Sequence, residues 1–270
     1  MSKNVGELMN FTDSHCHLDF SELSNELPQL LSHCLQANIR QIIVPAVSPQ
    51  KWPQLLELCK NNTSNCQLYP CLGIHPWYLN DLTTEHLQQL EANLTIHQES
   101  IIAVGETGID GLIAKEQDNL NKQQAFFQYH IELANQFSKP LIVHHRRSHQ
   151  QVIQQLKQSP VNHGGIIHAF SGSYQQGVTY IDMGFKLGIG GTITYDRAEK
   201  TIKAIKRLPL DCLVLETDAP AMPLSGQQGQ INTPLNLIKI FEQLCLIRNE
   251  DKEEIAEEIE NNIQQLFFRM

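Results

Sequence analysis

Two histidines near the start of the chain stand two residues apart. His15 and His17 occur in the string Asp-Ser-His-Cys-His, directly after a short apolar run. In an extended chain, residues two apart project to the same side, so the two imidazoles would lie together while Cys16 turns away. Neutral imidazoles are common ligands of divalent metal ions, and the pair therefore indicates a metal site. Two ordinary histidines are the alternative for a His-x-His string taken alone.

Further side chains that can bind a metal follow other apolar runs. Glu106 comes after Ile-Ile-Ala-Val-Gly, His144 after Pro-Leu-Ile-Val, and His168 after Gly-Gly-Ile-Ile. Asp218 stands just past Cys-Leu-Val-Leu-Glu-Thr. One such residue could simply be the polar end of a strand. Together with the histidine pair they place metal-compatible side chains at the ends of five strands, which is an improbable result of chance.

These four histidines and two carboxylates exceed the needs of one catalytic zinc ion, which usually takes three protein ligands. They suit two divalent ions joined by a bridging carboxylate, and Glu106 is expected to be the bridge. The other five ligands are expected to divide between the ions as His15, His17 and Asp218 on one, and His144 and His168 on the other. Ligands rich in imidazole suit Zn²⁺ and Mn²⁺ as well as Mg²⁺. We expect Asp218 to act as the general base, with Glu106 as its catalytic partner.

The elements that must position these residues recur along the chain. The apolar runs predict eight strands, about 29 residues apart on average, at residues 10–14, 41–46, 67–73, 101–105, 140–144, 165–168, 185–190 and 212–216. Helical periodicity between them marks residues 23–37, 82–97, 119–137, 148–157 and 197–208, and two amphipathic helices are expected within 232–266. Strands separated by helix-length segments are typical of parallel pairing.

The placement of the candidate ligands selects the architecture. In an open doubly wound sheet, the first and eighth strands would not converge with the fourth to sixth, whereas a closed barrel brings all eight strand ends around one mouth. The glycine fingerprint of a dinucleotide fold is also missing after the first strand. We therefore predict an α/β protein with a (β/α)₈ TIM barrel and a metal site at the C-terminal face of its strands.

Composition sets further limits. The chain has 270 residues, of which 41% are hydrophobic and 18% charged, as in globular proteins. Its net charge of −9 excludes a protein that is basic throughout and wraps nucleic acid. No linker divides the chain, so we expect one domain over residues 1–270 with an N-terminal extension at 1–9. The seven scattered cysteines are expected to be reduced, and the lack of a long apolar segment favours a cytoplasmic protein that does not enter a membrane.

Six strings in the chain resemble those of one enzyme family. They are Asp-Ser-His-Cys-His-Leu-Asp (13–19), Gly-Ile-His-Pro (73–76), Gly-Glu-Thr-Gly-Ile-Asp (105–110), Pro-Leu-Ile-Val-His (140–144), Ile-His-Ala-Phe-Ser-Gly-Ser (167–173) and Leu-Glu-Thr-Asp-Ala-Pro (215–220). In this order they resemble the TatD family of metal-dependent deoxyribonucleases, within the amidohydrolase-like barrels, from about residue 11 to residue 268. Residues 190–195 and 222–224 resemble the YjjV-like branch of that family.

The resemblance implies hydrolysis of phosphodiester bonds in DNA, supported by Mg²⁺. Its ligand positions fall on the same six residues: His15, His17, Glu106, His144, His168 and Asp218. The chain departs from the family at His145, where a small polar residue is more common, so two adjacent histidines compete and the alignment selects His144. Residues 111–118 also differ from the more common family pattern.

Several other residues are candidates for weaker roles. His75 is expected to contact a substrate phosphate or to support a ligand, with a packed loop histidine as the alternative. Arg146 is expected to bind a phosphate, as is its neighbour Arg147, although both could be solvated. Glu216 is interpreted as a group that orients a ligand. A basic stripe at Arg197, Lys200, Lys203, Lys206 and Arg207 could gather DNA or merely be solvated.

Three classes of function fit these observations. The first is a metal-dependent nuclease that cleaves DNA, single-stranded or at short ends, with no membrane and no obligate protein partner. The second is a C–N or ester hydrolase of the same superfamily, which would act on a small molecule with nearly the same ligands. The third is a non-catalytic interaction protein, and the complete ligand set argues against it. No lysine takes the bridging position after the fourth strand, which argues against the hydrolases that use a carbamylated lysine.

Overall fold

Eight parallel strands form the centre of the fold in a computed structural model that describes residues 9–268. Neighbouring strands pair in sequence order from the first to the eighth. They are β1 (Phe11–Asp13), β2 (Ile39–Pro45), β3 (Gln67–Leu72), β4 (Ala103–Asp110), β5 (Leu141–Arg146), β6 (Gly165–Ile167), β7 (Phe185–Ile189) and β8 (Leu213–Leu215). Each of the eight predicted runs overlaps one strand, and β2, β4 and β5 extend beyond the predicted bounds.

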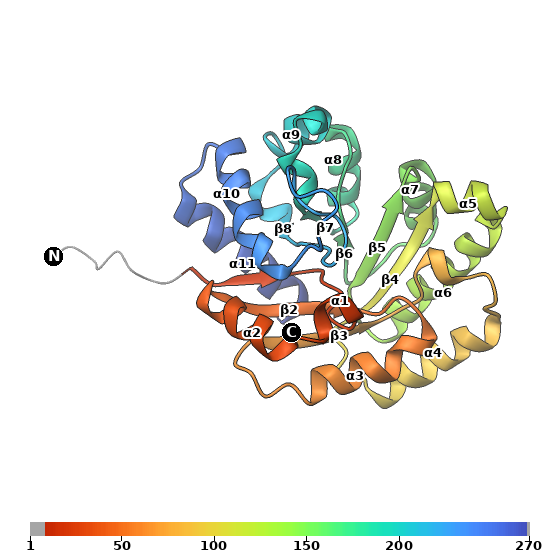
Figure 1. The fold of residues 1–270 in the computed structure, drawn as a ribbon. Coiled ribbons are helices and arrows are strands. Elements are labelled where there is room, and N and C mark those ends of the chain that lie inside the picture. Colours follow the sequence, from red (N-terminus) through yellow and green to blue (C-terminus); the bar gives the residue numbers. More distant parts are fainter. Residues whose placement is uncertain (1–8, 269–270) are drawn as a thin grey trace.

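Backbone hydrogen bonds between the first and last strands close the sheet. The Ser14 N–H group donates to the Leu215 carbonyl at 2.9 Å, and beyond the strand ends the Asp218 N–H group donates to the His15 carbonyl at 2.9 Å. Because these ends meet, the carboxyl ends of all eight strands surround one mouth. The predicted (β/α)₈ barrel is confirmed, and Figure 1 shows its helices on the outside of the strands.

Eleven α-helices lie among the described residues. They are α1 (Ser21–Ser24), α2 (Leu27–Gln36), α3 (Trp52–Lys60), α4 (Thr84–Ile96), α5 (Gly111–Gln117), α6 (Leu120–Gln136), α7 (His149–Gln158), α8 (Tyr174–Asp182), α9 (Glu199–Ile205), α10 (Leu237–Ile247) and α11 (Lys252–Phe267). The sequence named neither α3, α5 nor α8. Within residues 9–268, no helix has the length and apolar character needed to cross a membrane.

Two predicted helices have different bounds in the structure. The single helix expected over 23–37 is wrong, because α1 ends before Asn25 and α2 begins at Leu27 with Pro28 in its first turn. Proline suits the first turn of a helix but not its interior, since it has no N–H group to donate. The helix expected over 197–208 is also too long, because α9 ends at Ile205. The basic stripe therefore begins before this helix and ends after it.

The fourth strand is longer than predicted, and this changes the position of Glu106. Between Val104 and Thr107, β4 contains one more residue than the opposite segment of β5. Such a bulge locally disrupts pairing and re-aims a side chain. The strand then resumes and continues to Asp110. Glu106 therefore lies within β4, and the expectation that it follows the end of the strand is wrong.

The buried side chains and the state of the cysteines fit the prediction of a globular protein without disulfide bonds. All seven cysteines are unpaired, and five of them are buried. Tyr180, Phe127 and Phe241 are among the largest fully buried side chains. Of the predicted N-terminal extension, only Met9 lies within the described residues, and it packs against this core.

The Glu260 carboxyl group on α11 forms hydrogen bonds with Thr12 in β1, the first strand of the barrel. Glu260 Oε1 accepts a hydrogen bond from the Thr12 N–H group at 2.6 Å, and its Oε2 lies 2.8 Å from Thr12 Oγ1. The same hydroxyl lies 3.1 Å from Gln41 Oε1 and has only one proton to donate. A protonated Glu260 would donate to Thr12, which would free that proton for Gln41. Burial raises the pKa of Glu260 to about 7, against the effect of these hydrogen bonds.

Substituting Glu260→Gln is therefore expected to change how stability depends on pH. A carboxyl pKa that is higher in the folded state than in the unfolded state gives stability at low pH, and this stability is lost as the pH rises through about 7. The amide can make the same contacts without ionising. Between pH 5 and 8, the wild-type free energy of unfolding should fall by on the order of 2 kcal/mol more than that of the variant. Urea unfolding of both proteins measures this, and parallel pH profiles would contradict it.

Candidate metal centre

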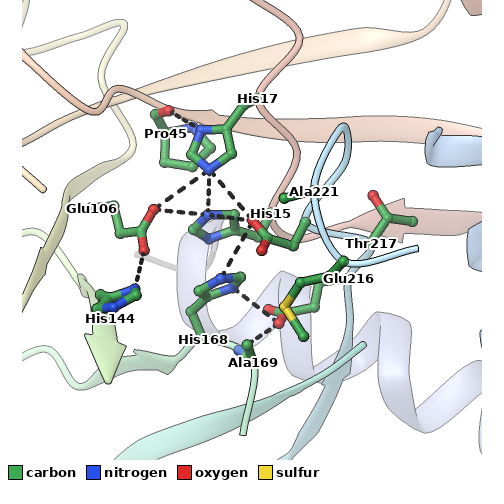
Figure 2. A network of polar contacts seen from close by, with 12 residues as sticks. His15, His17, Pro45, Glu106, His144, His168, Ala169, Glu216, Thr217 and Ala221 are labelled. Carbon is green, nitrogen blue, oxygen red and sulfur yellow. Dashed lines mark hydrogen bonds and ion pairs between the residues drawn. The ribbon is translucent and has the colours of Figure 1, made fainter. Parts of the chain in front are cut away.

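His15 and His17 lie just beyond β1 and point toward each other. Their Nε2 atoms are 3.2 Å apart, as the spacing of two residues predicts. The His17 Nδ1–H group donates to the Pro45 carbonyl at 3.0 Å, so its Nε2 carries a lone pair toward the barrel interior. Figure 2 shows both rings facing Glu106. Cys16 turns away and forms a backbone bridge with Ala219.

Glu106 lies between two groups of histidines. Its Oε2 atom is 3.1 Å from His15 Nε2 and 3.5 Å from His17 Nε2. Its Oε1 atom is 3.0 Å from His144 Nδ1 and 3.3 Å from His75 Nε2. Burial would raise the pKa of this carboxyl, but the surrounding histidines hold it well below its usual range. An ionised carboxylate with one oxygen toward each group has the geometry expected of a bridge.

Asp218 is the second carboxylate of the cluster and follows β8. Its Oδ1 atom lies 3.5 Å from His17 Nε2, 3.5 Å from His168 Nε2 and 3.7 Å from His15 Nε2. Burial would raise its pKa, but His168, His17 and His15 hold it below the usual range, so the group is ionised. The side chain is 14% exposed, against 2% for Glu106, and it faces the cavity above the cluster.

A carboxylate outside the predicted ligand set orients His168. Glu216 Oε1 lies 3.0 Å from His168 Nδ1 and accepts a hydrogen bond from the Ala169 N–H group at 2.6 Å. This leaves His168 Nε2 directed toward Asp218. The interpretation of Glu216 as an orienting group therefore has a structural basis. The His168 ring also stacks on the ring of His15, with centroids 3.5 Å apart.

His144 has a carboxylate partner of its own. Its Nε2 lies 3.2 Å from Asp110 Oδ2, which leaves its Nδ1 directed toward Glu106. Asp110 also accepts hydrogen bonds from the Trp77 indole at 2.7 Å and from two N–H groups in the first turn of α5. Burial would raise the Asp110 pKa, but the hydrogen bonds from His144 and Trp77 hold it below the usual range. Asp110 thus positions His144, and sequence reasoning gave it no role.

His145, the competing histidine, lies away from this cluster. Side chains alternate along β5, so His145 points away from the barrel interior and stacks near His149, with ring centroids 4.3 Å apart. Burial lowers the His145 pKa well below its usual range, which keeps the ring neutral. The choice of His144 over His145 therefore has a geometric basis.

His75 contacts Glu106 through a nitrogen that carries a proton. Its Nδ1 accepts a hydrogen bond from the Trp77 N–H group at 3.1 Å. Burial lowers the His75 pKa to about 4, against the opposing effect of Glu106, so the ring is neutral at pH 7 and its proton lies on Nε2. The Nε2–H group lies 3.0 Å from His144 Nδ1 and 3.3 Å from Glu106 Oε1, so it can donate to either. This geometry favours support of His144 and Glu106 over a phosphate contact.

Another histidine missed by sequence reasoning holds the loop that carries His75. The His130 ring accepts a hydrogen bond from the Ile74 N–H group at 3.0 Å and donates to the Phe126 carbonyl at 2.7 Å. Both ring nitrogens are thus used within the protein. Its position inside the long helix α6 offered no sign of this role.

The predicted set of six ligands, called the metal centre below, forms one cluster, and all of them except the fully buried His15 line one cavity. They are His15, His17, Glu106, His144, His168 and Asp218. Among residues 9–268, neither Glu106 nor Asp218 has a lysine or arginine nitrogen within 4.0 Å. Two ionised carboxylates among imidazole nitrogens, with no lysine or arginine beside them, form a donor set that fits divalent cations. No contact joins His144 to His168, so their placement on one ion stays a prediction.

The cavity above the metal centre has a volume of about 480 Å³ and is called the mouth cavity below. Arg146 lines it with a half-exposed side chain whose guanidinium lies 5.9 Å from the Trp77 ring centroid. Trp77 and Tyr78, both more than 40% exposed, form part of its wall. Arg147 is not part of this lining.

Substituting Asp110→Asn is expected to weaken the metal centre without unfolding the barrel. The amide can still cap α5 through its oxygen, but the carboxylate that orients His144 is lost. Changes of this kind typically reduce metal affinity or activity by about 10–100-fold. Metal titration of the variant and the wild type measures the affinity. Equal affinities, together with equal turnover, would contradict the orienting role.

Comparison with known proteins agrees with this geometry. The model of the TatD related DNase family matches residues 12–268. The uncharacterized metal-dependent hydrolase YjjV of Escherichia coli K12 is 39% identical over 260 residues, covering 96% of this chain and 98% of YjjV. An uncharacterized metal-dependent hydrolase of Haemophilus influenzae is 38% identical over 263 residues, covering 96% of this chain and the whole of that protein.

Comparison with solved structures agrees with the match to the family model. The crystal structure of YjjV, a TatD homolog, superposes with a TM-score of 0.92 and covers 97% of this chain and 99% of YjjV, at 39% identity. A TatD family hydrolase from Entamoeba histolytica shares the fold with a TM-score of 0.85 at 17% identity, covering 98% of this chain and the whole of that one. The chain belongs to the TatD related DNase family and is a metal-dependent hydrolase of that family.

Proposed function

We propose that this hydrolase cleaves phosphodiester bonds at the ends of DNA strands, with two divalent ions (Mg²⁺, Zn²⁺ or Mn²⁺) held by the metal centre. One observation carries the proposal. Glu106 places one oxygen against His15 and His17 and the other against His144, at 3.0–3.5 Å, at the bottom of a cavity with an arginine at its mouth. Paired ions bridged by a carboxylate are common in enzymes that hydrolyse phosphate esters.

In the proposed reaction, the metal ions and the protein side chains have different tasks. Divalent ions at such a site polarise the phosphoryl oxygens and favour the ionisation of water near neutral pH. Asp218 is ionised and partly exposed to the mouth cavity, so its carboxylate can accept the proton of an attacking water molecule. Glu106 is less exposed than Asp218, and its two oxygens face the two groups of histidines, so its role is to hold the two halves of the centre together. His75 directs its Nε2–H group at His144 and Glu106 and supports the orientation of both side chains.

The wall of the mouth cavity suits a nucleotide. Arg146 carries a guanidinium that can bind a phosphate through two hydrogen bonds. Trp77 and Tyr78 are exposed aromatic side chains on which a base can stack, and the indole of Trp77 is fixed by Asp110. A cation beside an aromatic surface matches the charge and the flat face of a nucleotide end.

Activity on three substrates tests the proposal. An end-labelled single-stranded oligonucleotide, an aryl phosphodiester and a small cyclic amide are incubated with the protein, with and without added Mg²⁺, Mn²⁺ or Zn²⁺. We expect release of terminal nucleotides that depends on metal and is abolished by a chelator. Full activity of metal-free protein in the presence of chelator would overturn the role of the metal. Turnover of the amide without any cleavage of the oligonucleotide would replace the proposed substrate with a small molecule.

A further inference from the structure

Two further hollows extend from the mouth cavity toward α9. The first has a volume of about 480 Å³ and shares Ser171, Thr192 and Met222 with the lining of the mouth cavity. The second, of about 510 Å³, shares Arg197 with the first and reaches Arg207. The first hollow thus adjoins the mouth cavity, and Arg197 lies between the first hollow and the second. The two outer hollows together are called the lateral groove below.

The far end of the lateral groove is basic, although the chain is acidic. Arg197, Lys200, Lys203 and Arg207 line it, with Glu199 as its one carboxylate. Glu199 is 2.9 Å from Lys203 and is neutralised by it. Within residues 9–268, the other three cations have no carboxylate within 4.0 Å. Three uncompensated positive charges in one hollow of a protein with a net charge of −9 form a local site for an anion.

Aromatic rings hold the two arginines in place. The Arg197 guanidinium lies 4.5 Å from the centroid of the Tyr195 ring, and that of Arg207 lies 4.2 Å from the centroid of Tyr174. The Tyr195 hydroxyl donates to the Pro223 carbonyl at 2.6 Å, which fixes its ring in the wall of the groove. Tyr174 begins α8, beside α9 (Figure 1). Guanidinium groups stacked in this way lose less freedom when they bind a phosphate.

The lateral groove shares lining residues with the mouth cavity above the metal centre, so a chain molecule that is long enough could contact both. We propose that the groove binds the phosphates of a single DNA strand whose end lies at the metal centre. This inference rests on the proposed function and adds that the substrate is a single-stranded oligonucleotide, longer than the part that fills the mouth cavity. Lys206 belongs to the basic stripe in sequence but does not line the groove, so it takes no part in this binding.

Oligonucleotide binding in the absence of turnover is the first test. Fluorescein-labelled (dT)₁₂ and (dT)₃ are titrated with metal-free protein in chelator, and anisotropy is recorded at several salt concentrations. The groove variant is Arg197→Gln/Arg207→Gln. The control variant is Lys157→Gln/Lys206→Gln, which removes the same charge from exposed sites outside the groove.

The wild type and the control variant should bind (dT)₁₂ more tightly than (dT)₃, and the groove variant should lose about 10-fold in affinity for (dT)₁₂ alone. Its salt dependence should also become shallower, by about 0.7 in log–log slope for each phosphate contact that is lost. Restoring the charge with Arg197→Lys/Arg207→Lys should recover most of the binding. Equal affinities of the wild type and the groove variant for (dT)₁₂ would overturn the proposal. Melting temperatures establish that each variant is folded.

Cleavage of the same oligonucleotides by metal-loaded protein separates this proposal from the proposed function. If kcat/KM rises with strand length in the wild type and not in the groove variant, both stand. Cleavage that is independent of length overturns the groove and leaves the nuclease. Length-dependent binding without cleavage overturns the nuclease and leaves the groove as a binding site. Absence of both binding and cleavage overturns both.

Discussion

Substituting Asp218→Asn is expected to lower turnover by about 100-fold or more while the barrel remains folded, since general-base assistance typically contributes about 10²–10⁴. Asp218 is the more exposed of the two ionised carboxylates that line the mouth cavity, at 14% against 2% for Glu106. The amide has nearly the same shape but cannot accept the proton. Steady-state kinetics with an aryl phosphodiester measures the change in kcat.

The metal content of the Asp218→Asn variant is the control for this prediction. Asp218 also lies within 3.7 Å of His15, His17 and His168, so its loss could weaken metal binding. The rates are therefore compared at metal concentrations that saturate both proteins. Wild-type turnover by the saturated variant would show that another group takes the proton.

The second large effect is expected for Glu106→Gln, which should reduce metal affinity by at least about 100-fold. Glu106 contacts the nitrogens of His15 and His144 with different oxygens, and its pKa is held well below the usual range. Replacing a bridging carboxylate by a neutral amide removes the charge that both ions share. Metal analysis after gel filtration, with circular dichroism as the control for folding, measures the loss.

A Glu106→Gln variant that retained two ions per chain would contradict the bridging role. Retention of one ion would instead show that one half of the centre binds metal by itself. The comparison with Asp218→Asn then separates the two carboxylates. The first substitution should act mainly on metal retention, and the second mainly on kcat at saturating metal.

The spacing of the apolar runs predicted eight parallel strands, and the candidate ligands at the ends of five of them selected a closed barrel. Parallel strands must be joined by crossover helices, so eight buried runs separated by helix-length segments leave few architectures. The spacing of His15 and His17 likewise predicted that their rings would meet, and the structure shows their Nε2 atoms 3.2 Å apart. These features depend on local chain geometry, which the sequence alone determines.

Features that depend on distant contacts could not be predicted in this way. The extra residue in β4 appears only when that strand is aligned with β5, and it moves Glu106 into the strand. Asp110 orients His144 from the C-terminal end of β4. The neighbouring Gly108 and Gly111 interrupt the apolar pattern, so the sequence did not predict that the strand extends to Asp110. His130 lies 56 residues from Ile74, and only the tertiary fold brings them together.

The basic stripe was predicted as one face of a helix, and the structure arranges it differently. Arg197 lies in the short 3₁₀ turn Asp196–Ala198 before α9, and Arg207 follows the helix. A spacing of three or four residues does not show where a helix begins or ends. The cavity linings, rather than the spacing, separate the cations that face the lateral groove from Lys206, which does not.

The most direct test of the metal centre is a crystal structure of the protein grown with Mn²⁺, with anomalous difference maps. The predicted result is two peaks joined by Glu106, at bonding distances of about 2.0–2.5 Å. One peak should lie among His15, His17 and Asp218, and the other on the His144 side of the bridge. A map without a peak bonded to Glu106, under conditions in which the protein hydrolyses a phosphodiester, would contradict the account.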